Sequence, residues 1–149
     1  MFETSEMRSL VARLGELRAD VSDAERVDRI RLLTEIEAAC AAARAQETAR
    51  FVSAQRSAQA AAGVPPARVG RGIASQVALA MRVSPYRAAR YVGWAMVLTS
   101  ELPRTFGELA AGRTSEWRAV LVARETMFLS RPRPRPCRCR DRPAAAPDG

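Results

Sequence analysis

The sequence contains no histidine, no lysine and no asparagine, so all 24 of its basic residues are arginine. Without histidine there is no imidazole to act as a general base, to activate a serine or cysteine, or to bind a metal ion. Without lysine there is no Schiff-base chemistry and no phosphate-binding Walker lysine. These absences remove the commonest catalytic centres. We therefore expect a protein that is not an enzyme, with no catalytic residues and no cofactor.

Cysteine is scarce as well, with three residues at Cys40, Cys137 and Cys139. The C-x-C pair near the C-terminus supplies two thiolates, whereas a structural zinc site needs four ligands, so no metal site is expected. Three cysteines are also too few for a disulfide framework. Because Cys40 lies in an alanine-rich run, it is predicted to be a small buried thiol.

Long apolar runs are missing too, and the first residues are acidic rather than basic, unlike a signal peptide. No apolar run approaches the ~20 residues that span a bilayer. We expect a cytoplasmic protein that makes no use of a membrane.

The chain is 48% hydrophobic but only 5% aromatic, and much of the apolar content is alanine. This composition predicts an all-α fold with a thin core.

Apolar residues recur at helical spacing over residues 5–18 and again from Asp23 to about Ala62, with Ser22 and Glu25 in the S-x-x-E pattern of a capping box. Together they predict a long helical hairpin over residues 1–62. The apolar stripe of the second helix contains Val27, Ile30, Leu33, Ile36, Cys40, Ala43 and Phe51. It faces either the core of a helical bundle, which we favour, or a second copy in a homodimer through the long helix.

Glycine and proline then interrupt the pattern over residues 63–72, a flexible linker that carries Arg68 and Arg71. Two short helices joined by a tight turn follow, because Ser84 and Pro85 supply an N-cap and a first helical position. This is the pattern of a helix-turn-helix. Arg82 occupies the turn position at which such motifs favour glycine, since the backbone there often needs a positive φ.

The second of these helices has two distinct faces. Its core face is predicted to hold Ala88, Val92 and Ala95, while Tyr86, Arg87, Arg90 and Tyr91 fall on the remaining surface. Arginine and tyrosine on the second helix of such a motif are typical of DNA binding. The candidate nucleic-acid-binding residues are therefore Tyr86, Arg87, Arg90, Tyr91, Arg68 and Arg71, and the alternative is that these side chains are simply solvated.

The helical pattern continues to complete a compact bundle over residues 73–130. Leu102–Pro103 is expected to end the second helix, and a capping box from Thr105 to Glu108 to begin a short one that stops at Gly112. Ser115 is expected to cap the last helix. Residues 131–149 alternate arginine with proline and are predicted to form a disordered basic tail, which carries half of the net charge of +8.

Three segments occur in order, Val83-Ser84-Pro85, Leu102-Pro103 and Leu109-Ala110-Ala111-Gly112-Arg113. In this combination residues 1–130 resemble the actinobacterial 13E12 repeat family, also called domain of unknown function 222. The resemblance implies a helical domain that usually precedes an HNH endonuclease module, often in repetitive or phage-related elements. Such a module needs histidine and usually asparagine, and this chain has neither.

These observations lead to one main hypothesis and two alternatives. The main hypothesis is a non-catalytic helical domain of that family, truncated without its nuclease module, which binds DNA non-specifically through the helix-turn-helix-like segment. The first alternative is a structural or self-association domain. The second is an inert remnant of a mobile-element-related nuclease gene, in which residues 131–149 are translated out of frame after a frameshift.

Overall fold

The computed structural model describes residues 3–129, and these form six α-helices and one short 3-10 helix with no strand. The elements are α1 (Thr4–Gly15), α2 (Asp23–Ala61), η1 (Pro66–Arg68), α3 (Ile73–Met81), α4 (Pro85–Ser100), α5 (Pro103–Ala110) and α6 (Glu116–Leu129). The all-α prediction is confirmed. The predicted disordered tail, residues 131–149, lies outside the described residues.

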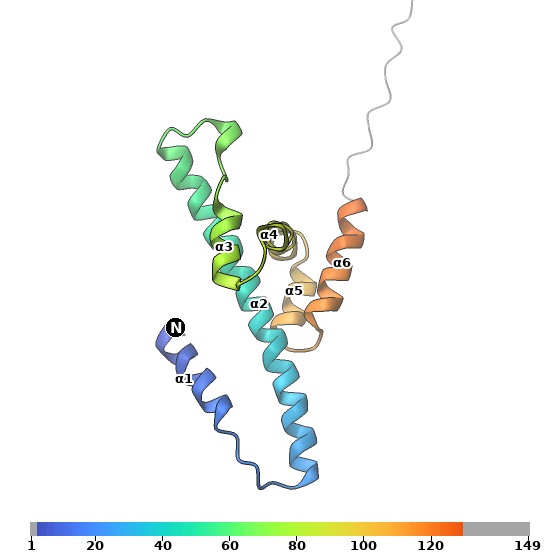
Figure 1. The fold of residues 1–149 in the computed structure, drawn as a ribbon. Helices are drawn as coiled ribbons and strands as arrows, with labels where there is room; N and C mark the ends of the chain where they lie inside the picture. The colour runs from blue at the N-terminus through green and yellow to red at the C-terminus, as the bar shows by residue number, and fades with distance from the viewer. Residues whose placement is uncertain (1–2, 130–149) are drawn as a thin grey trace, which may run out of the picture.

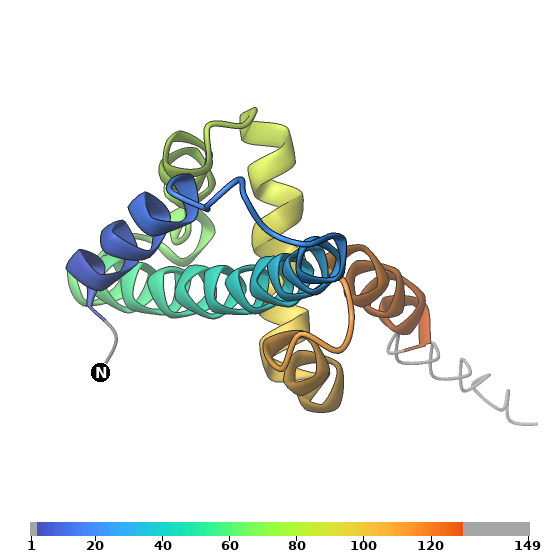
Figure 2. The ribbon, with the colours of Figure 1, turned by 90° about the horizontal axis from the view of Figure 1, so that it is seen from below.

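The long helix α2 is the element against which the others are arranged. It has 39 residues, which corresponds to about 58 Å at 1.5 Å per residue. Helices α3, α4, α5 and α6 gather along one side of it, while α1 turns back from the loop before α2 (Figure 1). Seen from below, α4 crosses α2 steeply, between α3 and α5 (Figure 2).

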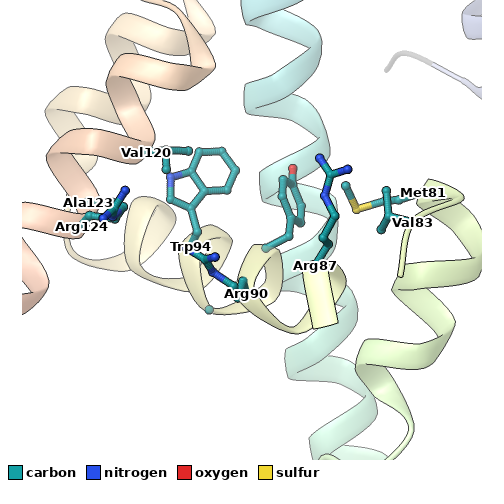
Figure 3. Close-up of a pocket in the computed structure, with 10 residues that line it drawn as sticks. Met81, Val83, Arg87, Arg90, Trp94, Val120, Ala123 and Arg124 are labelled. Atoms are coloured by element: carbon teal, nitrogen blue, oxygen red, sulfur yellow. The ribbon is translucent and has the colours of Figure 1, made fainter. Parts of the chain in front are cut away.

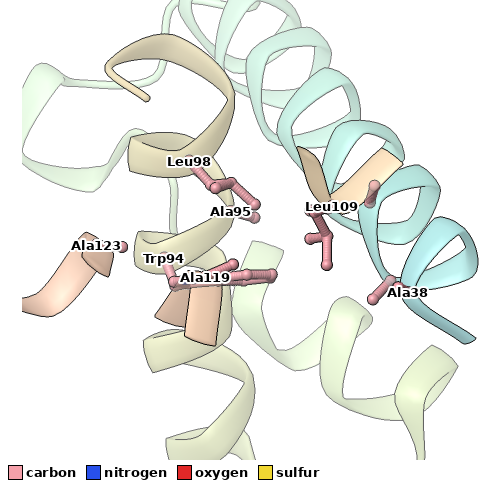
Figure 4. Close-up of a cluster of buried hydrophobic side chains, with 10 residues drawn as sticks. Ala38, Trp94, Ala95, Leu98, Leu109, Ala119 and Ala123 are labelled. Atoms are coloured by element: carbon pink, nitrogen blue, oxygen red, sulfur yellow. The ribbon is translucent and has the colours of Figure 1, made fainter. Parts of the chain in front are cut away.

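Small side chains on α2 allow the other helices to approach closely. Its buried residues are Ala38, Ala41, Ala42, Ala45, Thr48 and Val52, at the three- and four-residue spacing of one helical face. Seven of the ten buried residues in the main core cluster are alanine, so most of the core volume comes from Trp94, Leu98 and Leu109. Figure 4 shows the side chains of Ala95 and Leu98 directed from α4 toward α2. The core is as thin as the composition predicts.

The predicted apolar stripe of α2 is wrong in part. Cys40 and Ala43 are exposed, and Cys40 is a free thiol on the surface rather than in the core. Val27 and Ile30 are 66% and 65% exposed because the buried face of α2 begins at Ala38, beyond both of them. The larger apolar residues dominated the helical periodicity from which the stripe was predicted. The residues of α2 that the other helices contact are mainly alanines on an adjacent face.

The predicted hairpin is present as a reversal of the chain between α1 and α2, but it has no buried core of its own. Arg29 and Arg26 hold the connecting loop by donating hydrogen bonds to the carbonyl oxygens of Arg18 at 2.7 Å and Ala19 at 3.0 Å. Helix α1 nevertheless buries no residue, and Val11 is 70% exposed. The N-terminal region therefore presents apolar side chains to solvent.

Helix starts follow the sequence closely. The Ser22 hydroxyl accepts a hydrogen bond from the Glu25 N–H at 3.2 Å, and the Ser84 and Ser115 hydroxyls cap α4 and α6 in the same way. The predicted capping box at Thr105 is wrong, because α5 already begins at Pro103. Proline can open a helix as readily as it ends one, since the first helical N–H needs no partner within the helix.

Candidate nucleic-acid interface

Helices α3 and α4 form the expected helix-turn-helix arrangement. Arg82 has a φ of +54° and a ψ of +45°, and among residues 3–129 it is the one non-glycine residue with positive φ. The turn is closed by hydrogen bonds from the Arg82 N–H to the Leu79 carbonyl at 3.2 Å and from the Val83 N–H to the Ala78 carbonyl at 3.0 Å. An L-residue in this left-handed region carries about 1 kcal/mol of strain. The turn geometry is therefore achieved without the glycine that would suit it.

The first turns of α4 present aromatic and cationic side chains to solvent. Tyr86 is 71% exposed, and the guanidinium carbon of Arg90 lies 5.9 Å from the centre of its ring. Arg87 and Arg90 are also exposed. Neither is paired with a carboxylate in the part of the chain that the structure describes. Unpaired, exposed guanidinium groups are available to contact phosphate.

Tyr91 does not belong to that exposed face, so its predicted surface position is wrong. Its hydroxyl accepts a hydrogen bond from Arg44 Nε at 3.2 Å, and its ring lies 5.1 Å from that of Trp94. Arg44 also donates to both carboxylate oxygens of Glu116, at 2.9 and 3.0 Å. Tyr91 follows the buried Ala88 by three residues, which places it on the core face of α4.

This contact set joins three helices and shifts two pKa values. Burial raises the pKa of Tyr91, and the hydrogen bond from Arg44 opposes that rise only in part. Burial alone would lower the pKa of Arg44, but its hydrogen bonds to Tyr91 and Glu116 outweigh that effect and raise it. Arg44, Tyr91 and Glu116 thus bind α2, α4 and α6 together, which is a structural role.

Arg68 and Arg71 form a second, separate cationic group. They lie before α3, whereas Arg87 and Arg90 come after it, and α3 has nine residues, or about 13 Å (Figure 1). Gln59 orders their loop: its Oε1 accepts a hydrogen bond from the Gly70 N–H at 2.6 Å, and its Nε2 donates one to the Arg71 carbonyl at 3.2 Å. The six predicted residues therefore do not form one cluster.

Both cationic groups lie in the basic part of an asymmetric chain. Residues 1–47 contain seven arginines against ten acidic residues, a net charge of −3. Residues 48–130 contain eleven arginines against four acidic residues, a net charge of +7. This division can be read from the sequence, and it places both cationic groups in the part of the chain with the positive net charge.

A pocket of about 610 Å³ opens between α4 and α6. Apolar side chains of Met81, Val83, Trp94 and Val120 line it, together with the three arginines Arg87, Arg90 and Arg124 (Figure 3). Trp94 is 7% exposed, and its indole Nε1–H has no hydrogen-bond partner within the described residues. No sequence pattern pointed to this site, because it depends on how α6 packs against α4.

Neither protein-family models nor curated proteins nor solved structures gave a match to this chain. Within residues 3–129, no helix is both long and apolar enough to cross a membrane. The same residues contain no group of three or more cysteine, aspartate or glutamate side chains that could hold a metal ion.

Proposed function

We propose that this chain is a non-catalytic helical domain that binds duplex DNA non-specifically through the exposed face of α4. The observation that carries the proposal is that Arg87 and Arg90 are exposed and unpaired at the start of the second helix of a helix-turn-helix. Sequence-independent DNA binding rests on such phosphate contacts. Arg68 and Arg71 supply further contacts from the other end of α3. On this proposal the chain acts in the cytoplasm.

Fluorescence anisotropy of a labelled DNA duplex tests this proposal. The full chain is compared with Arg87→Ala/Arg90→Ala and with Arg8→Ala/Arg13→Ala, a matched control that removes the same charge from exposed positions of α1. Removing two phosphate contacts is expected to reduce the slope of log K against log salt by about 1.8. The control variant should keep the slope of the unmodified chain.

The arginines of the tail need a separate control. Replacing all six arginines of residues 131–149 with serine, in the otherwise intact chain, measures what the tail contributes to affinity. Binding that survives this change and depends on Arg87 and Arg90 supports the proposal. Binding that vanishes with the tail charge, and is equal with or without Arg87 and Arg90, contradicts it and favours the reading as an inert remnant.

A second candidate function is self-association, which the exposed apolar residues of the N-terminal region favour. Val27 and Ile30 on α2 are 66% and 65% exposed, and Val11 on α1 is 70% exposed. Apolar side chains gathered on one region mark interaction surfaces more often than scattered ones do. Light scattering coupled to size exclusion should show a dimer that Val27→Ser/Ile30→Ser disrupts and that Val122→Ser, an exposed position on α6, leaves intact.

Membership of the 13E12 repeat family is part of the same proposal. It is supported by the order of the three sequence segments. The frameshift hypothesis concerns residues outside those described. Translating the other two reading frames downstream of Ser130 tests it, since an HNH-like sequence should appear in one of them.

A further inference from the structure

The pocket between α4 and α6 combines an apolar lining with three arginines and no acidic residue. Arg87 and Arg90 reach it from α4 and Arg124 from α6, while Met81, Trp94 and Val120 supply apolar surface (Figure 3). No aspartate or glutamate lines it. Its volume of about 610 Å³ falls within the roughly 300–1,000 Å³ that is usual for small-molecule sites. The pocket therefore suits a ligand that has both an apolar body and a negative charge.

The three arginines are free to bind such a ligand. All three are exposed, and none forms an ion pair with another residue in the described chain. A planar guanidinium matches a carboxylate with two parallel hydrogen bonds. Arg87 lies beside Met81 and Arg124 lies on the far side of Trp94, with Arg90 also on the rim (Figure 3). Each is a like charge on one pocket, and a bound anion reduces the repulsion among them.

Other occupants fit these features less well. A phosphate group of DNA satisfies the arginines but leaves the apolar lining against water. The chain's own C-terminal residues 131–149 carry six arginines against two aspartates, so they are repelled by the same charge. A wholly apolar molecule fills the lining but leaves the guanidinium groups without a partner.

We propose that this pocket binds small amphipathic carboxylates. The aryl or alkyl group packs against the apolar lining, and the carboxylate binds to arginine side chains of the pocket. One consequence rests on the DNA-binding proposal: because Arg87 and Arg90 serve both ligands, a bound carboxylate competes with DNA. The pocket would then make the DNA affinity of α4 responsive to a small molecule.

Calorimetry with 4-phenylbutyrate as the probe, and 4-phenylbutanol as its neutral analogue, tests the pocket itself. The full chain should bind the carboxylate at least tenfold more tightly than the alcohol. Arg124→Gln should weaken phenylbutyrate binding about tenfold, the lower end of the contribution of a hydrogen bond between charged groups. The matched control Arg118→Gln, an exposed arginine on the same helix outside the pocket, should bind as the unmodified chain does.

Trp94 provides a second readout at the site. In a Trp117→Phe background Trp94 is the sole tryptophan, and its emission should change with the same affinity that calorimetry gives. Equal binding of the alcohol and the carboxylate, an Arg124→Gln variant that binds normally, or no binding of either compound would each overturn the proposal.

Competition is then measured by adding phenylbutyrate to the DNA complex, with acetate at equal ionic strength as the control. Phenylbutyrate should release DNA from the unmodified chain and should need about tenfold more ligand to do so with Arg124→Gln. Ligand binding without DNA release would overturn the shared use of Arg87 and Arg90. A chain that binds phenylbutyrate but no DNA would refute the proposed function while leaving the pocket intact.

Discussion

Replacing Gly112 with alanine should destabilise the fold strongly, because two separate features of this turn exclude a side chain. The residue has a φ of +74°, and its N–H donates to the Leu109 carbonyl at 3.1 Å where α5 ends. A Cβ atom there would lie 2.8 Å from the Cβ and 3.0 Å from the Cα of Glu35 on α2. The turn between α5 and α6 thus rests directly on the long helix.

The expected loss is about 3 kcal/mol in the free energy of unfolding. Left-handed backbone costs an alanine about 1 kcal/mol. Non-bonded carbon atoms are most favourable at about 3.5–4.0 Å, so the turn or α2 would have to shift by roughly 0.7 Å. Overpacking of this kind costs about 1–3 kcal/mol. Such a loss is a large part of the ~5–15 kcal/mol that stabilises a typical domain.

Urea unfolding followed by far-UV circular dichroism measures this loss, with two other glycines as controls. Gly63 has a φ of +76° but nothing within 4 Å of its Cβ position, so Gly63→Ala should lose only about 1 kcal/mol. Gly107 lies inside α5 with open space around it, so Gly107→Ala should gain about 0.5–1 kcal/mol. If Gly112→Ala lost no more stability than Gly63→Ala, the close approach to Glu35 would be refuted.

Four further measurements test the structure. Arg82→Gly should raise the free energy of unfolding by about 1 kcal/mol, because it removes left-handed strain. Tyr91→Phe should lose about 1 kcal/mol with the hydrogen bond from Arg44. Because the pKa of Tyr91 is raised on folding, the unmodified chain should lose stability as pH rises above 10.0, and Tyr91→Phe should lose less over that range. Cys40 should react with a thiol reagent in the folded chain once the two tail cysteines are replaced by serine, since it is exposed.

Features fixed by neighbouring residues could be predicted from the sequence. Ser22, Ser84 and Ser115 cap their helices as expected because the hydroxyl and the N–H it accepts from are three residues apart in the chain. The positive φ of Gly112 followed from the same local logic at a helix end. The start of α5 could not be predicted in this way, because Pro103 is compatible with both the end of one helix and the beginning of the next.

Features that depend on which helices meet could not be predicted in the same way. The buried face of α2 consists mainly of alanine, whose small side chain gives little hydrophobic contrast, so the periodicity of larger residues indicated the wrong face. The inward position of Tyr91 could have been predicted, because Tyr91 follows the core residue Ala88 by three positions and so lies on the same helical face. The pocket could not be predicted, because Arg124 and Arg87 are 37 positions apart and line one pocket only through the packing of α6 on α4.

Arg82 is the residue at which local preference and observed structure disagree most. It holds a left-handed backbone that glycine would adopt without strain, and its exposed side chain forms no ion pair with the residues that the structure describes. Residues that break a local rule without a structural compensation are expected at functional sites. Its charge lies on the turn that leads into α4, close in sequence to Arg87. A variant Arg82→Gly that becomes more stable and binds DNA more weakly would join Arg82 to the proposed interface, whereas a gain in stability with unchanged affinity would leave it outside.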